Sequence, residues 1–128
     1  MNPGPLTFAL ALVLAGAPFP AAAEIVDLEW DATGRAERKF DVAPGKFVEL
    51  CGKLPAGAKV QWQFEAAAPL NFNVHYHVGK EVRYPARSDQ VSVSSGELDA
   101  SVEQGYCWMW TNKTASPVAL SVLLRRGS

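Results

Sequence analysis

The chain has 128 residues, a usual length for one domain, and its 12 basic and 13 acidic side chains give a formal net charge of −1. This near-neutral balance offers no electrostatic reason for binding to nucleic acid or to an anionic membrane surface. We therefore expect no nucleic acid as a partner.

The first segment has the pattern of a secretory signal peptide. An apolar run from Leu6 to Phe19 is too short to span a bilayer comfortably, and Ala21 to Ala23 supply an A-x-A cleavage pattern. The segment before the run lacks the usual Lys or Arg. We predict that residues 1–23 are removed on export and that no transmembrane segment then remains. Residues 24–128 would form one domain that is periplasmic or secreted.

From residue 24 onward, apolar residues alternate with a period of two and show no helical period. Between the alternating segments lie ATG, APG, LPAG, APL, HVGK, SSG and TASP, which we predict to be turns. We predict strands at roughly 24–30, 37–42, 46–51, 58–65, 70–78, 81–84, 90–94, 97–102, 105–112 and 117–125. So many short strands favour an all-β fold, an antiparallel, jelly-roll-like β-sandwich.

Cys51 and Cys107 are the only cysteines of the chain. An even pair in an exported protein is most simply a disulfide. In the entropic model, closing a loop of this length stabilises the fold by about 4 kcal/mol. Two free thiols, or a thiolate metal ligand, would require a reducing compartment, which the predicted signal peptide argues against.

Both histidines lie in the predicted strand 70–78, one residue apart. Because side chains alternate along a strand, its apolar and polar residues fall on opposite faces. The apolar face would hold Phe72, Val74, Tyr76 and Val78, and the polar face Asn71, Asn73, His75 and His77. The following VGKEV would be the turn that sends the chain back through Val82 and Tyr84.

The order of these features resembles the GOLD (Golgi dynamics) domain, the lumenal β-sandwich of small cargo receptors that cycle between endoplasmic reticulum and Golgi. The similarity spans about residues 44–125, through CGKLPAGAKVQWQFEA, APLNFNVHYHVGKEVRYP and SGELDASVEQGYCWMWTN. The matching positions are Cys51, Gly79, Lys80, Val82, Tyr84, Gly96, Gly105, Tyr106, Cys107 and Asn112. The resemblance implies a β-sandwich, a bond between the two cysteines and a general binding role. It does not imply trafficking, because the family's coiled coil, membrane helix and cytoplasmic tail have no counterpart here.

His75 and His77 form one candidate metal site. On a strand they project from the same face with Cα atoms about 6.5 to 7 Å apart, so both imidazoles can reach one ion. Met109 is the best third ligand, because thioether with imidazole suits copper, whereas zinc would more often take a further His, Cys or carboxylate. The alternative is that the two histidines belong to a solvated outer face, since H-x-H alone is a weak motif.

The block YCWMW is the second candidate site. Tyr106, Trp108 and Trp110 share one face of their strand, and Cys107 and Met109 share the other. We favour a core role for the three aromatic residues, in which the tryptophans pack against the disulfide. In the alternative, they form an aromatic platform for sugar, lipid or peptide.

No nucleophile elbow, phosphate loop or zinc-hydrolase motif occurs in the sequence. A Cys107 nucleophile with a His75 base would require the disulfide to be absent. Asn112-Lys113-Thr114 fits the N-glycosylation pattern. Our leading hypothesis is a non-enzymatic exported binding module, without a cofactor, for a protein or lipid partner. The alternative is a periplasmic copper-binding protein that uses His75, His77 and Met109.

Overall fold

The computed structural model describes residue 4 and residues 23–127, so almost all of the predicted signal peptide lies outside the described residues. The described chain forms seven strands and no helix, which confirms the all-β prediction. In chain order they are β1 (Glu24–Asp27), β2 (Arg35–Val42), β3 (Phe47–Leu54), β4 (Lys59–Val78), β5 (Glu81–Asp99), β6 (Gln104–Thr111) and β7 (Val118–Arg126). Accordingly, the described residues include no helix that could cross a bilayer.

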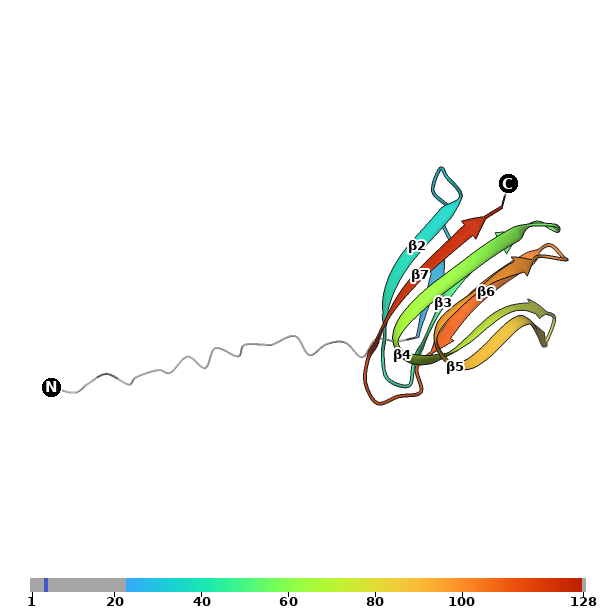
Figure 1. Ribbon diagram of the computed structural model, residues 1–128. Coiled ribbons are helices and arrows are strands. Elements are labelled where there is room, and N and C mark those ends of the chain that lie inside the picture. The colour runs from blue at the N-terminus through green and yellow to red at the C-terminus, as the bar shows by residue number, and fades with distance from the viewer. Residues whose placement is uncertain (1–3, 5–22, 128) are drawn as a thin grey trace.

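The strands form two layers that share the long hairpin of β4 and β5 (Figure 1). The hydrogen-bonded order is β1-β3-β6-β4-β7-β2, and β5 pairs with the other edge of β4. Residues 60–66 of β4 pair with β7, whereas residues 71–75 pair with β6. The first layer therefore contains β2, β7 and the first half of β4, and the second contains β1, β3, β6 and its second half. All pairs are antiparallel except β1 with β3.

Two predicted turns lie inside the long strands. The APL segment at 68–70 falls where the β4–β5 register shifts, so it bends β4 without ending it. The SSG segment at 94–96 is part of β5, where Gly96 pairs with Trp62. A Cβ on Gly96 would overlap the Trp62 indole, so this glycine makes room for a ring and does not turn the chain.

The core lies between the two layers and is rich in aromatic rings. Phe64 and Phe72, one from each half of β4, have ring centroids 4.8 Å apart, and Phe64 meets Trp110 edge to face at 5.6 Å. Trp108 and Trp110 are fully buried and Tyr106 is 1% exposed. All three therefore have the core role that we favoured, and none is available at the described surface as a binding platform.

Cys51 and Cys107 form the predicted disulfide. They are direct partners on β3 and β6, with Cα atoms 4.1 Å apart. Both side chains point to the outer face of the second layer, because the residues beside them in sequence point into the core. The expectation that the tryptophans pack against the disulfide was therefore wrong.

Asn112, at the end of β6, is fully buried. Its Nδ2 donates to the carbonyl oxygens of Val42 and Ser116, at 2.9 and 2.8 Å. Its Oδ1 accepts from the backbone N–H and the hydroxyl of Thr114. Asn112 fits the N-glycosylation pattern, but the nitrogen that would carry the glycan is buried and joins the ends of two strands inside the fold.

Candidate functional site

The outer face of the second layer brings together the residues that the sequence suggested as metal ligands. Strand register aligns Cys51, Cys107 and His75 in one row across β3, β6 and β4. It aligns Glu49, Met109 and Asn73 in the next row. Side chains at these alternate positions share one face of the sheet. These six side chains therefore lie together on one surface, in two adjacent rows.

His75 is 5% exposed although it lies on an outer face. Its Nδ1 is 2.7 Å from Oδ1 of Asn73, and its Nε2 is 3.1 Å from Oε1 of Glu49. An amide oxygen only accepts hydrogen bonds, so Nδ1 carries the proton of this bond. In a neutral imidazole, Nε2 then has a free lone pair that can accept a hydrogen bond, and this nitrogen faces the carboxyl group of Glu49.

Burial perturbs both members of the Glu49–His75 pair. Desolvation raises the pKa of Glu49, an effect that the nearby charge of His77 partly offsets. Desolvation lowers the pKa of His75, and His77 lowers it further. Both shifts favour the uncharged forms, so the carboxylic acid of Glu49 can donate its proton to Nε2 of His75. One proton then satisfies both buried groups.

Glu49 is a member of the site that we did not expect from the sequence, although two signals pointed to it. Glu49 is the polar member of the alternating segment VELC, between the buried Val48 and Leu50. It also lies two residues before Cys51, hence on the same face. What the sequence did not provide is the pairing of β6 with β4, which brings His75 within reach.

His77 and Met109 share this face but do not complete a preformed metal site. The His77 side chain is exposed, and its ring centroid is 5.3 Å from that of His75. Among the described residues, the one set of three His, Cys or carboxylate donors within 4.8 Å of one another is Glu49, Cys51 and Cys107. The sulfur atoms of that set are bonded to each other, so they do not act as thiolate ligands.

The end of the β4–β5 hairpin, residues 77–84, is called here the hairpin tip. Pairing of β4 with β6 ends at His75, so the chain beyond it pairs with β5 alone. Gly79 has a φ of 60°, as the first position of a type II′ turn requires. Val78, Val82 and Tyr84 are 43%, 37% and 50% exposed. The tip therefore presents apolar side chains to solvent.

Charged side chains lie within and beside the hairpin tip. Arg83 pairs with Glu81 at 2.6 Å, and the Arg87 guanidinium lies 5.5 Å from the centre of the Tyr84 ring. Tyr84 is in turn 6.0 Å from the His75 ring, measured between centroids. The tip is thus continuous with the surface above the Glu49–His75 pair.

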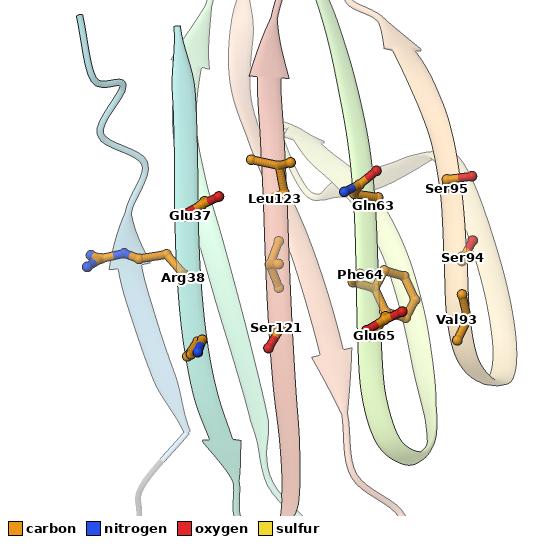
Figure 2. A pocket seen from close by; sticks show the side chains of 12 residues that line it. Glu37, Arg38, Gln63, Phe64, Glu65, Val93, Ser94, Ser95, Ser121 and Leu123 are labelled. Atoms are coloured by element: carbon orange, nitrogen blue, oxygen red, sulfur yellow. The ribbon is translucent and has the colours of Figure 1, made fainter. Parts of the chain in front are cut away.

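A groove of about 720 Å³ crosses the outer face of the first layer. Figure 2 shows Ser121 and Leu123 of β7 in its middle, with Glu37 of β2 on one side and Gln63 and Glu65 of β4 on the other. Val93 and Ser95 of β5 form the far wall. The lining mixes carboxylate, basic, amide and hydroxyl groups with three aliphatic side chains and one phenylalanine ring, and it contains neither histidine nor cysteine.

No protein-family model matches the chain, and no curated protein matches it either. Solved structures do share its fold. PliG of Aeromonas hydrophila, described as a periplasmic lysozyme inhibitor of g-type lysozyme, is 14% identical, with a TM-score of 0.63 over 83% of this chain and 98% of that chain. PliG of Salmonella Typhimurium is 12% identical, with a TM-score of 0.59 over 83% and 100% of the two chains.

A third similar structure is the pre-peptidase C-terminal domain of a Bacillus anthracis collagenase. It is 10% identical, with a TM-score of 0.57 over 83% of this chain and 97% of that chain. The resemblance to the GOLD domain was therefore wrong, since neither a family model nor these structural neighbours support it. It rested on isolated glycines, strand alternation and paired cysteines, which unrelated β-sandwiches can share. By fold alone, the chain is similar to the PliG inhibitors and to this collagenase domain.

Proposed function

We propose that the protein is an exported, non-enzymatic module that binds and inhibits a lysozyme of the g type through its hairpin tip. The observation that carries the proposal is the similarity in fold to PliG, which covers 98% of the Aeromonas chain. The near-complete coverage supports a role for the domain as a whole. The predicted signal peptide would bring it to the compartment in which the PliG proteins are described.

The exposed side chains of the hairpin tip support it as the contact surface. Of the six large hydrophobic side chains that are exposed in the described part of the chain, three are Val78, Val82 and Tyr84. Tyr and Arg are enriched where proteins bind one another, and here Arg87 lies over Tyr84. A projecting hairpin can also enter a concave site such as an enzyme cleft.

The bonded cysteines support a role without catalysis. The described residues contain no free cysteine, so Cys107 is not a nucleophile for His75 in this state. Nδ1 of His75 is already engaged in a hydrogen bond with Asn73. The Glu49–His75 pair is also buried, and a general base must reach its substrate directly or through one water molecule.

The test measures lysis of bacterial cell walls by a g-type lysozyme in the presence of the purified protein. We expect inhibition to increase in proportion to the amount of 1:1 complex, and calorimetry measures the formation of that complex. Replacing Val82 and Tyr84 together by Ala should weaken binding by at least about tenfold. Val93→Ala is the matched control, because Val93 is 67% exposed on the same strand but lies in the groove.

Three results would overturn the proposal. One is the absence of any inhibition or complex with the wild-type protein. Another is equal weakening by the tip variant and by Val93→Ala, which would move the contact away from the tip. The third is binding to vesicles of phosphatidylglycerol without inhibition, which would make the partner a lipid.

A further inference from the structure

Glu49 and His75 turn two potential metal-ligand atoms toward each other. Zinc binds imidazole nitrogen and carboxylate oxygen at about 2.0 to 2.2 Å, which places neighbouring ligand atoms roughly 3.3 to 3.6 Å apart in a tetrahedron. The Oε1 to Nε2 distance is 3.1 Å, so a slight separation of the two side chains would give the spacing that an ion needs. A divalent cation can therefore take the place of the shared proton.

We propose that Glu49, His75 and His77 bind a divalent metal ion on the outer face of the second layer. The ion would lie between Oε1 of Glu49 and Nε2 of His75, His77 would supply the third ligand, and water would complete the shell. Metal binding would add a function to the one proposed above, at a site that adjoins the hairpin tip through His77.

Asn73 gives His75 the support that metal-binding histidines commonly have. Such histidines usually donate their second ring N–H to an oxygen acceptor, which fixes the ring and its tautomer. The hydrogen bond of 2.7 Å from Nδ1 of His75 to Asn73 does so here. It leaves the lone pair of Nε2 directed at the position of the proposed ion.

His77 completes the set by a side-chain rotation. Its ring lies 5.3 Å from that of His75 between centroids, and its side chain is exposed, which leaves room for the movement. Met109 lies in the same row as Glu49 and on the same face of the sheet. A set of two imidazoles and one carboxylate suits Zn²⁺ or Cu²⁺, whereas a set with the thioether would suit Cu⁺.

The test is a competition titration of the purified protein, with its disulfide intact, against a chromophoric zinc chelator at neutral pH. We expect one Zn²⁺ per chain. His77→Ala should weaken binding by more than about tenfold, as should Glu49→Gln, which keeps the shape of the side chain. Loss of the supporting bond in Asn73→Ala should cost roughly 10- to 100-fold in affinity. Met109→Leu, on the same face, should leave zinc affinity unchanged.

His77 is exposed, so its variant folds and decides the question even if Glu49→Gln does not. The proposal is overturned if the wild type binds no zinc, which would leave a proton as the cation between Glu49 and His75. It is equally overturned if wild type and His77→Ala bind zinc alike, or if Met109→Leu alone weakens binding. None of these readouts involves lysozyme, so they do not depend on the inhibitor proposal.

Discussion

Glu49 on β3 reaches across β6 and meets His75 on β4, with Oε1 and Nε2 3.1 Å apart, although their strands are not neighbours in the sheet. The Cys51–Cys107 disulfide lies next to this contact, because both cysteines align with His75 in one row across the sheet. A buried acid and a buried base are thus held together on the outer face of a sheet.

This pair predicts a particular dependence of stability on pH. Burial raises the pKa of Glu49 above 4.5, so the folded protein keeps a proton that the unfolded chain releases, and stability falls as pH rises above 4.5. Burial lowers the pKa of His75 below 6.5, so stability falls as pH decreases below 6.5. Between pH 4.5 and 6.5 the two contributions therefore change in opposite directions. We expect the pair's contribution to stability to depend on pH, with the loss from Glu49 growing toward higher pH and the loss from His75 growing toward lower pH.

Urea unfolding from about pH 3 to about pH 9, in a buffer with a metal chelator, measures this profile. The matched control is the double variant Glu49→Gln, His75→Gln, which retains polar side chains without titrating. Subtracting its profile from that of the wild type removes the contribution of every other group. A flat difference over the whole range would contradict the prediction.

A second prediction concerns the disulfide. Cys51 and Cys107 are separated by 56 positions, and opening this link should lower the free energy of unfolding by about 4 kcal/mol in the entropic model. Chemical unfolding with and without a thiol reductant measures the difference. The variant with both cysteines replaced by Ala should show the lower stability and no response to reductant. Equal stability of the oxidised and reduced wild type would refute the prediction.

The residue faces and most turns followed from the sequence because they depend on neighbours in the chain. Alternation placed Trp108 inward and Met109 outward, and Gly79 marked the turn before Val82. The sequence did not predict that neighbouring strands would join into the long strands β4 and β5. Local rules interpret APL and SSG as turns, whereas the partners of these segments hold them in the sheet.

The candidate site was half predictable for the same reason. His75 and His77 were visible as a pair on one face of a strand. The disulfide alone would have fixed the register of β3 with β6, and with it the position of Glu49 beside Met109. The contact with His75 depends on a further pairing, β6 with β4, and on a side chain that spans two strands. Neither leaves a local signal.

A third prediction tests the role of Gly96. A Cβ at this position would overlap the indole of Trp62, so Gly96→Ala forces the ring or the strand to move. Overpacking of this kind typically costs about 1–3 kcal/mol. Gly105→Ala is the control, because Gly105 is also in a strand, has no positive φ and has nothing within 4 Å of the added Cβ. Thermal unfolding of both variants should show a lower Tm for Gly96→Ala alone.

A fourth prediction concerns Asn112, whose side chain bonds to the backbone of Val42, Thr114 and Ser116 from a fully buried position. Asn112→Ala takes the Nδ2 donor away from the buried carbonyl group of Val42, and an unsatisfied buried group costs roughly 1–3 kcal/mol. Asn112→Asp retains the acceptor for Thr114 but loses the two bonds that Nδ2 donates. We therefore expect the free energy of unfolding to fall in both variants, and Thr114→Val, which removes only the hydroxyl contacts, to fall less. If Asn112→Ala were as stable as the wild type in urea, the bonds made by Asn112 would not hold the ends of β2 and β6 together.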